Sequence, residues 1–399
     1  MTGTANESAR ACNMVVGHLL AHAGMGGAET YLALIANAHA RRGLGSKIIV
    51  LSEPGPVSER FDPEVSVEYL GYQRESIRNP FRFAASIIRG YGLISRAVKN
   101  QGIQVLQTHL PDTNLWGLAL SLTGKCKVVV TIHNNRFLRG TEKKSFSSFV
   151  KLKAYRMMFR HCGAIVAVSG EVKKSLLATL GVSDDDADRV VVVDNGVPVP
   201  DPLPEETQLE VRTRYSVGVD DFWIVAAGRL TEAKNFQCLV DAASLLKEKG
   251  LPVRILIGGE GHLRPDLEQQ IAELGVGDTV SLPGNLQDLG DVMRAADLLA
   301  MPSRWEGLPM VLLEAMARGV PVVGTRINGL VDIIEEGRHG LLVDVDDSEG
   351  LAAAIEKMVR DPESRLEMGR AAIELVREKF DFRRVYDDLC RVYDQAMSR

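Results

Sequence analysis

The sequence predicts an α/β protein of two domains, each with a parallel β-sheet covered by helices. Three observations predict it. A chain of 399 residues exceeds what one core ordinarily holds, short β-branched segments alternate with helical patterns, and a proline-rich interruption lies near the middle. The same alternation begins again after that interruption, so we expect two similar Rossmann-like domains that face a central cleft.

The first half repeats a strand–helix pattern. Residues 14–20 form an apolar segment that runs into a glycine loop at 24–27, and a helical pattern follows at 28–42. Further short strands are expected at 47–51, 105–108, 128–132 and 164–168. Because parallel neighbours need a crossover between them, this order predicts a parallel sheet with helices on its faces.

The interruption marks the predicted domain boundary. Four prolines within 194–204 exclude a helix or a central strand. We therefore expect one domain at 1–196, a second at 197–379 and a terminal helical segment at 380–399. The second domain has expected strands at 223–227, 254–257, 279–282, 298–301, 320–323 and 341–343, and helices are expected at 348–360, 362–379 and 382–397.

Composition narrows the class of protein. Five scattered cysteines without a C-x-x-C pair argue against a disulfide framework or a zinc site. No apolar run reaches the roughly 20 residues that cross a bilayer, and the polar start lacks the order of a signal peptide. We expect a cytoplasmic protein without a nucleic-acid partner. Residues 1–200 carry 24 Lys and Arg against 16 Asp and Glu, whereas the remainder carries 23 against 36, so we expect the basic half to meet an anionic partner.

Two glutamates stand eight positions apart after the expected strand at 298–301. Glu306 precedes Gly307 and Pro309, and Glu314 lies more than one turn beyond them. Proline suits a first helical position, so a helix is expected to start at Pro309 and to offer unpaired amide groups to an anion. Carboxylates on either side of such amides suit a ligand with hydroxyls at both ends and phosphate between them, which describes a nucleotide-sugar.

A pair of cations follows the first strand of the second half. Arg229 and Lys234 are five positions apart in the segment 228–235, at the mouth of a strand and ahead of a helix. A guanidinium fork and a lysine point charge can reach opposite sides of a diphosphate. The alternative, two solvated surface cations, is weakened by their position at the strand's carboxyl end.

Histidines end two neighbouring strands of the first half. His133 follows the strand at 128–132, and His109 ends the strand before it. His133 could donate to a sugar hydroxyl or stabilise developing charge, whereas the alternative is a structural, hydrogen-bonded histidine. His109 is expected to be its neighbour or part of the core.

The glycine loop at 24–27 admits a second interpretation. It follows a strand and opens a helix, so its amides can approach a phosphate or an acceptor, although a tight turn alone would look the same. Glu29 occupies the place of the third glycine of a dinucleotide fingerprint. Glu53, after the next strand, could imitate the ribose-binding acid of an NAD enzyme. An NAD-dependent oxidoreductase is therefore one alternative function.

Two charged stretches remain. Residues 136–160 mix cations with apolar residues and, if helical, predict a basic amphipathic surface for an anionic membrane or a lipid-linked acceptor. An ordinary interdomain helix with a cationic outer face is the equal alternative. The triplet Asp184, Asp185 and Asp186 is interpreted as a solvated turn, not as a metal site.

Taken together, these motifs resemble the family-4 retaining glycosyltransferases of the GT-B fold, of the bacterial polysaccharide and glycoconjugate type. The resemblance covers most of the chain and is densest from 228 to 344. It is carried by Gly-Gly-Ala-Glu at 26–29, Gly-Arg-Leu-x-x-x-Lys-Asn at 228–235, Gly-Gly-Glu-Gly at 258–261 and Glu-x7-Glu at 306–314. Many relatives have Glu-Gly-Phe-Gly-Leu-Pro after the first glutamate, but here Gly307 leads directly to Leu308 and Pro309, which alters the expected amide contacts.

The resemblance implies roles for individual residues. The first domain would bind the acceptor, the second would bind the nucleotide-sugar, and the terminal helix would cross back onto the first. Arg229 and Lys234 would clamp the donor diphosphate, and His133 would lie near the donor sugar. The remaining donor contacts would come from Gly26, Gly27, Leu286 near the base, Glu306 at the transferred sugar, Gly307, Leu308, Pro309, Met310 and Glu314 at the ribose.

The expected activity is that of a metal-independent hexosyltransferase without a cofactor. The resemblance implies retention of anomeric configuration, and front-face attack is favoured because the sequence offers no obvious covalent nucleophile. The donor is expected to be a UDP-sugar, with GDP-mannose as the alternative, and the acceptor a saccharide or a lipid-linked sugar of the cell surface. A peripheral place on the inner face of the cytoplasmic membrane is expected through 136–160. A nucleotide-sugar 2-epimerase of the same fold and a non-catalytic nucleotide-sugar sensor are further alternatives.

Overall fold

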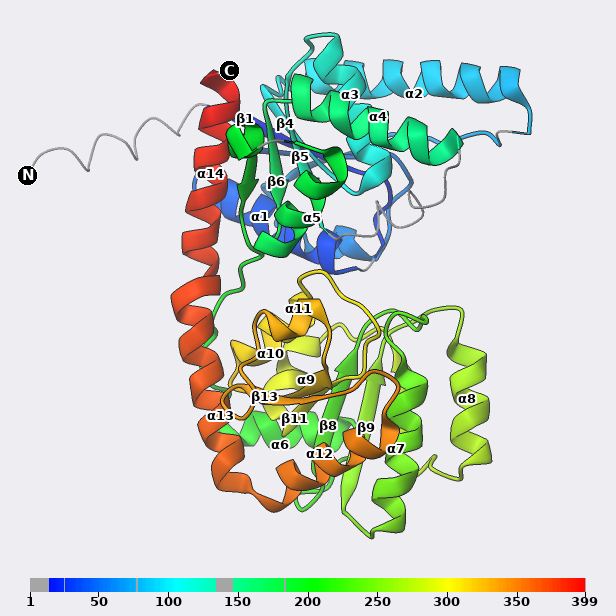
Figure 1. Ribbon diagram of the computed structural model, residues 1–399, viewed down its shortest axis with the longest axis vertical. Helices are drawn as coiled ribbons and strands as arrows, with labels where there is room; N and C mark the ends of the chain where they lie inside the picture. The colour runs from blue at the N-terminus through cyan, green and yellow to red at the C-terminus, as the bar shows by residue number, and fades with distance from the viewer. Residues whose placement is uncertain (1–13, 25, 77, 134–145, 183, 399) are drawn as a thin grey trace, which may run out of the picture. The chain divides into compact units, whose positions relative to one another are not determined.

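The computed structural model describes residues 14–24, 26–76, 78–133, 146–182 and 184–398, except the side chains of 146–148 and 184–186. Its contacts divide the chain into two compact units. Unit 1 comprises residues 1–195 and 385–399, and unit 2 comprises residues 196–384. Each is an α/β unit with one parallel sheet, so the two-sheet Rossmann-like architecture expected from the sequence is confirmed (Figure 1).

Unit 1 contains a seven-stranded sheet of order β3-β2-β1-β4-β5-β6-β7, with every pair parallel. The elements are β1 (Val15–Leu20), α1 (Gly27–Arg41), β2 (Gly45–Val50), the 3-10 helix η2 (Pro56–Arg60), β3 (Ser66–Tyr69), α2 (Pro80–Asn100), β4 (Val105–His109), α3 (Pro111–Leu122), β5 (Lys127–Ile132), α4 (Phe146–His161), β6 (Ala164–Ala167), α5 (Gly170–Leu180), the 3-10 helix η4 (Asp184–Arg189), β7 (Val190–Val192) and α14 (Phe382–Ser398).

Unit 2 contains a six-stranded parallel sheet of order β10-β9-β8-β11-β12-β13. The elements are α6 (Glu205–Arg214), β8 (Phe222–Ala227), α7 (Phe236–Glu248), β9 (Val253–Gly258), α8 (Arg264–Glu273), β10 (Val280–Gly284), α9 (Leu289–Ala295), β11 (Leu298–Met301), α10 (Met310–Met316), β12 (Val322–Thr325), α11 (Asn328–Val331), β13 (Gly340–Val343), α12 (Ser348–Arg360), α13 (Pro362–Leu375) and the π-helix η5 (Val376–Phe380).

The alternation along β8 shows how helices cover both faces of the unit 2 sheet. Phe222, Ile224 and Ala226 pack into one buried cluster with residues of α7 and α12. Trp223 and Val225 point the other way, into a second cluster with residues of α6 and α9. Because side chains alternate along a strand, a sheet buried on both sides needs a continuous apolar run, and β8 reads Phe-Trp-Ile-Val-Ala-Ala.

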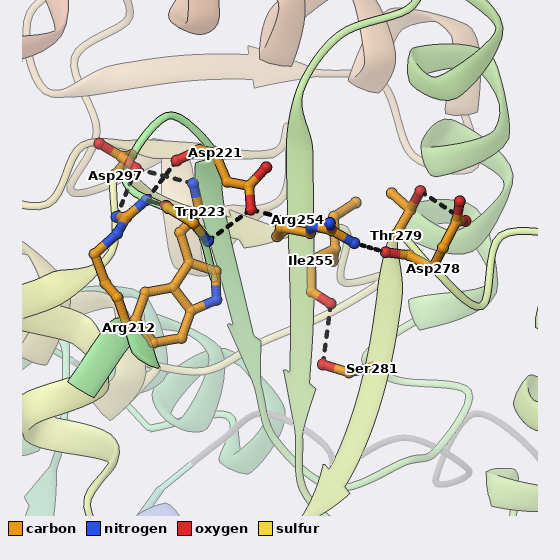
Figure 2. A network of polar contacts seen from close by, with 10 residues as sticks. Arg212, Asp221, Trp223, Arg254, Ile255, Asp278, Thr279, Ser281 and Asp297 are labelled. Carbon is orange, nitrogen blue, oxygen red and sulfur yellow. Dashed lines mark hydrogen bonds and ion pairs between the residues drawn. The ribbon is translucent and has the colours of Figure 1, made fainter. Parts of the chain in front are cut away.

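A polar network closes the amino ends of this sheet (Figure 2). Arg212 of α6 donates to Ala295 O at 3.0 Å and forms an ion pair with Asp297 at 3.3 Å. Asp297 also accepts from the Trp223 amide at 2.9 Å, and Arg254 of β9 pairs with Asp221 at 3.2 Å. All these groups precede or begin strands. The network therefore organises the amino edge of the sheet. Ligands of such sheets bind at the opposite edge, beyond the carboxyl ends of the strands.

Some elements differ from the expected ones. The strand expected at 320–323 begins at Val322, because Pro321 has no amide hydrogen for the ladder and contributes only its carbonyl, which accepts from Leu299 N at 3.0 Å. The helix expected at 362–379 changes to a π-helix at Val376. The edge strands β3 and β7 were not predicted, since they are short and only partly buried.

The last helix packs within unit 1. Tyr393 of α14 is fully buried and donates to Gln107 Oε1 of β4 at 2.5 Å, and Asp387 pairs with Arg42 at 2.7 Å. Its apolar positions recur at helical spacing: Val385, Tyr386, Leu389, Val392, Tyr393 and Ala396 are all buried. The C-terminal segment therefore covers part of the unit 1 core.

Candidate active site

Two loops meet at the carboxyl edge of the unit 2 sheet, after the adjacent strands β8 and β11. Lys234 Nζ, on the first loop, lies 2.6 Å from Glu306 Oε1 on the second. The Ser303 hydroxyl donates to the same oxygen at 2.8 Å. Both charged side chains are well shielded, with 18% and 13% of their surfaces exposed. The structure thus brings together two of the residues predicted from the sequence.

Further contacts fix the two loops to each other. Arg304 N donates to Ala233 O at 2.9 Å. Asp346 Oδ1 accepts from Arg304 Nε at 2.8 Å and from Asn235 Nδ2 at 3.0 Å. Asn235 adopts a left-handed conformation (φ 52°) at the start of α7, which asparagine tolerates better than most residues. These contacts restrict the positions that Lys234 and Glu306 can take.

Close backbone approaches explain two glycines near these loops. A Cβ at Gly259 would lie 1.9 Å from Gly228 O, and its φ of 142° disfavours any other residue. A Cβ at Gly329 would lie 2.5 Å from Gly307 O and 2.9 Å from Glu306 Cβ. Glycine is therefore needed where neighbouring loops pack against the segments that carry the charged residues.

The site can still offer positive charge to an anion. A lysine ammonium has three donors, so Lys234 can bind Glu306 and a phosphate oxygen at the same time. Arg229 is exposed on the same loop, five residues earlier. Together, an accessible guanidinium and a lysine held by a carboxylate fit a diphosphate that enters at this edge.

The segment after Glu306 differs slightly from expectation. The helix begins at Met310 rather than at Pro309, which is the N-cap with φ −74° and ψ 120°, an extended conformation. Leu308, Pro309 and Met310 are buried, and Gly307 is partly exposed. Because α10 has only seven residues, a large helix dipole cannot be invoked, and any help to an anion comes from individual amide groups.

Glu314 lies within α10 and is partly buried. Arg318 Nη1 donates to its backbone carbonyl at 2.7 Å, and Arg318 Nε donates to Gly290 O at 3.1 Å. Burial lowers the pKa of Arg318, which the charge of Glu314 opposes. Arg318 therefore supports the backbone that carries Glu314.

Leu286 is buried in the cluster of Trp223 and Val225, where it packs on Gly258.

Three predicted residues belong to unit 1. Gly26 is the N-cap of α1 and Gly27 its first residue, so the glycine loop does open a helix. His133 follows β5, and its Nε2 lies 3.2 Å from Nδ1 of His109. Burial lowers the pKa of His133 to about 4, so the ring is neutral near pH 7. His109 is thus the neighbour of His133 and a core residue at once.

Unit 1 also holds a cavity of about 690 Å³ at the carboxyl ends of its first strands. Tyr72 and Trp116 line it and meet edge to face, with ring centroids 5.9 Å apart. Its charged lining includes Glu53, Arg74 and Asp112, and the last two approach within 3.8 Å. An aromatic wall with carboxylates beside it can bind a polyhydroxylated ligand.

The described part of the basic stretch is α4. Tyr155, Met158 and Phe159 are buried, whereas Lys151, Lys153, Arg156 and Arg160 are exposed, so the second half of the helix packs its apolar side chains onto protein. Phe149 and Val150, near its start, are exposed. Residues 136–145 and the side chains of the acidic triplet lie outside the described residues. No helix in the described ranges is long and apolar enough to cross a membrane. Nor do these ranges contain three or more His, Cys, Asp or Glu side chains arranged so that they could hold a metal ion together.

Several positioning residues escaped prediction. Ser303 stands three residues before Glu306, and its position gives no signal in the sequence beyond that proximity. Arg304 and Asp346 are 42 residues apart, and only the fold brings them together. Arg318 follows Glu314 by four residues, one helical turn, and this spacing could have identified it.

Comparison with known proteins identifies the family of the chain. Residues 25–199 match the model of Glycosyltransferase Family 4, and residues 209–375 match that of Glycosyl transferases group 1. The chain is 30% identical over 365 residues to the D-inositol 3-phosphate glycosyltransferase of Pseudarthrobacter chlorophenolicus, covering 87% of this chain and 85% of the relative. It is 28% identical over 272 residues to the alpha-D-kanosaminyltransferase of Streptomyces kanamyceticus, covering 67% of this chain and 70% of the relative.

Solved structures match the fold. The crystal structure of HepE of Anabaena in complex with UDP and glucose superposes with a TM-score of 0.80 at 19% identity, over 96% of this chain and 99% of that one. The sucrose-phosphate synthase of Thermosynechococcus elongatus matches with a TM-score of 0.78 at 18% identity, over 96% and 99%. With its two parallel-sheet units and its match to a relative over most of both chains, the protein belongs to glycosyltransferase family 4 and has the GT-B fold.

Proposed function

We propose that this protein is a retaining glycosyltransferase that moves a hexose from a UDP-sugar to a saccharide or lipid-linked acceptor in cell-surface polysaccharide or glycoconjugate synthesis. The observation that carries the proposal is the shielded pair of Lys234 and Glu306 at the carboxyl edge of unit 2. It joins a phosphate-binding cation to a sugar-binding carboxylate, as a nucleotide-sugar requires.

The chemistry follows from where charge develops. The bond between the sugar's anomeric carbon and the diphosphate oxygen breaks, and its electron pair stays on the diphosphate. The acceptor hydroxyl forms the new bond on the same face, and its proton passes to the leaving phosphate oxygen. Arg229 and Lys234 stabilise the growing negative charge, and removing one such fixed stabiliser typically costs about 2.7–4 kcal/mol. In this proposal these cations replace a metal ion.

Glu306 acts on the sugar rather than as a nucleophile. Its Oε1 already receives hydrogen bonds from Lys234 and from Ser303. Both contacts stabilise the carboxylate's charge and reduce its nucleophilicity, while they fix it in one orientation for the sugar hydroxyls. Glu314, Gly307 and the amides from Leu308 to Met310 would hold the ribose and the phosphate, with Leu286 near the base.

A uridine donor is favoured because the Anabaena structure that shares this fold holds UDP and glucose. GDP-mannose remains the alternative donor. The acceptor is assigned to unit 1, where Tyr72 and Trp116 offer apolar edges to sugar C–H groups and Glu53 and Asp112 accept from hydroxyls. The lining of this cavity has two carboxylates, Glu53 and Asp112, and one arginine, Arg74. Because the carboxylates would repel a phosphate, a neutral saccharide fits this cavity better than a phosphorylated one.

A panel of UDP-, GDP- and ADP-sugars, with and without saccharide acceptors, tests the proposal. Release of UDP that depends on acceptor, and a product whose anomeric configuration by NMR matches the donor, are the expected results. A changed sugar without acceptor would indicate a 2-epimerase. Binding without release would indicate a sensor, and nicotinamide binding would indicate an oxidoreductase. An inverted product, or a glycosyl group trapped on Glu306, would overturn the front-face mechanism.

A further inference from the structure

A row of three imidazoles crosses the sheet of unit 1. His109 Nε2 lies 3.3 Å from His18 Nδ1, and His109 Nδ1 lies 3.2 Å from His133 Nε2. Their strands β1, β4 and β5 are adjacent. In the ladder, His18 pairs with Gln107 and His109 pairs with Thr131, so each next histidine stands two residues closer to the carboxyl edge. All three therefore share one face of the sheet.

The row is buried at its inner end. His18 and His109 are 0% and 1% exposed, and burial lowers the pKa of each below its ordinary value. The three rings are therefore neutral near pH 7, and each carries one ring proton. His39 of α1 lies beyond His18, with ring centroids 5.7 Å apart, but its Nδ1 donates to Ile35 O at 2.9 Å and it is not a member of the row.

Neutral rings in a row cannot choose their tautomers independently. Each N···N contact needs one proton, and His109 has only one to share between two contacts. Either all three rings are protonated on Nε2 or all three are protonated on Nδ1. In the first arrangement the buried Nε2–H of His18 would have no acceptor, since this atom has no hydrogen-bond partner among the described residues. In the second arrangement only a ring lone pair is unpaired there.

Buried N–H groups without a partner are rarer in proteins than buried acceptors without one. The second arrangement also places the remaining N–H on Nδ1 of His133, the half-buried residue at the end of the row. We propose that His18 and His109 are positioning residues that hold His133 in its Nδ1–H tautomer, as a hydrogen-bond donor to an oxygen of the substrate. The substrate part of this inference rests on the proposed transferase function.

The backbone around His109 is fixed as such a role requires. Thr113 Oγ1 donates to His109 O at 2.5 Å and accepts from His109 N at 3.1 Å. Leu110, which follows, has φ 72° and ψ 154°, a region that residues other than glycine rarely occupy. A strained conformation of this kind persists only where the surrounding structure holds it in place.

Nitrogen-15 NMR of the histidine rings in the labelled, substrate-free protein at pH 7.5 tests the inference directly. The spectrum of each ring separates a protonated nitrogen from a bare one, and His→Phe variants assign the signals among the eight histidines of the chain. The expected result is a neutral Nδ1–H tautomer for His18, His109 and His133. Nε2–H tautomers, a mixture of the two, or a charged ring in the row would overturn it.

Kinetics provide the second test. His109→Phe removes both contacts, and kcat is expected to fall about tenfold to a hundredfold, as when a histidine ligand loses its supporting partner. His109→Asn, whose amide can still donate to His133 Nε2, is expected to recover part of that loss. His39→Phe is the matched control, a buried histidine outside the row. Equal losses in the Phe variants at 109 and 39, or no rescue by Asn, would contradict positioning through the row.

The two tests fail separately. The NMR experiment uses no substrate, so a wrong tautomer would refute the row without touching the transferase proposal. If no nucleotide-sugar is turned over, the tautomers are still measured, and the transferase proposal alone falls.

Discussion

Lys234 and Glu306 show how a residue's environment decides its role. An exposed lysine–carboxylate pair would contribute little to stability. This pair is shielded from solvent, and the Ser303 hydroxyl also donates to the carboxylate of Glu306. Removing one member leaves the charge of the other poorly compensated, which destabilises the fold. A useful variant must therefore lower activity without unfolding the protein. Glu306→Gln keeps the shape and the contact with Ser303.

We expect Lys234→Ala and Glu306→Gln to lower kcat about 10²- to 10³-fold, because each removes a fixed interaction with the reacting groups. Steady-state assays with the identified donor measure this, and circular dichroism checks the fold. Lys249→Ala is the matched control, since Lys249 forms a 2.7 Å ion pair with Glu356 elsewhere in unit 2. Activity equal to the wild type in both site variants would refute the assignment.

Sequence patterns could predict these two residues but not their contact. The Glu-x7-Glu spacing and the Arg-x4-Lys spacing each indicated a ligand-binding loop. Pairing across 72 positions depends on the order of β8 and β11 in the sheet, which a local pattern does not contain. The same limit hid Arg304 with Asp346 and the row of His18, His109 and His133.

At the scale of elements, the loop glycines Gly259 and Gly329 are positions where the fold tolerates no other residue. Gly259→Ala would add a Cβ at 1.9 Å from Gly228 O and force a residue with φ 142°. We expect a loss in the free energy of unfolding of roughly 1–3 kcal/mol or more, measured by urea denaturation. Gly277→Ala is the control, because its Cβ would meet only Ile271 at 3.9 Å. Equal stability of the two variants would contradict the close packing of these loops.

Helix α4 carries the second prediction at this scale. Tyr155, Met158 and Phe159 are buried and the cations are exposed, while Phe149 and Val150 near the start of the helix are also exposed. With so small an exposed apolar area, we expect any membrane contact through α4 to be mainly electrostatic. Sedimentation with vesicles should show binding to anionic lipid at low salt that disappears at high salt and in the variant Lys151→Ala/Lys153→Ala. The exposed pair Arg383→Ala/Arg384→Ala serves as the charge-matched control. Binding to neutral vesicles, or binding that resists salt, would contradict this account.

Most elements could be predicted because central strands of a parallel sheet are continuous apolar runs. Helix α12 (Ser348–Arg360) has the predicted bounds for a different reason: the Asp347 side chain caps its start, and Asp361 after its end caps the start of α13. The edge strands could not be predicted, since β3 reads Ser-Val-Glu-Tyr and is only partly buried. Pro321 and Pro309 displaced two boundaries through the missing amide and the fixed φ of proline.

For the whole molecule, the buried histidines predict how stability depends on pH. Burial lowers the pKa of His39 and of His133 to about 4, against about 6.5 in an unfolded chain. Above pH 6.5 both states are neutral. Below it the unfolded chain binds protons that the folded chain does not, so the free energy of unfolding falls as the pH drops from 6.5 towards 4, by about 1.4 kcal/mol per unit for each such group.

Urea denaturation between pH 7.5 and 5 measures this slope. His39→Phe should reduce the slope, because it removes one of the groups whose protonation favours the unfolded chain. Stability that stays constant or rises as the pH falls in this range would show that the histidines are not held neutral.

The two-domain architecture could be predicted as a whole because the strand–helix pattern occurs twice around a proline-rich interruption. The activity rests on a narrower claim, that Arg229 and Lys234 bind the diphosphate of a nucleotide-sugar. Calorimetric titration with UDP and with uridine tests that claim most directly. The account predicts that UDP binds far more tightly than uridine and that Arg229→Ala and Lys234→Ala remove most of the difference. Equal affinity for UDP and uridine, or full UDP affinity in both variants, would contradict it.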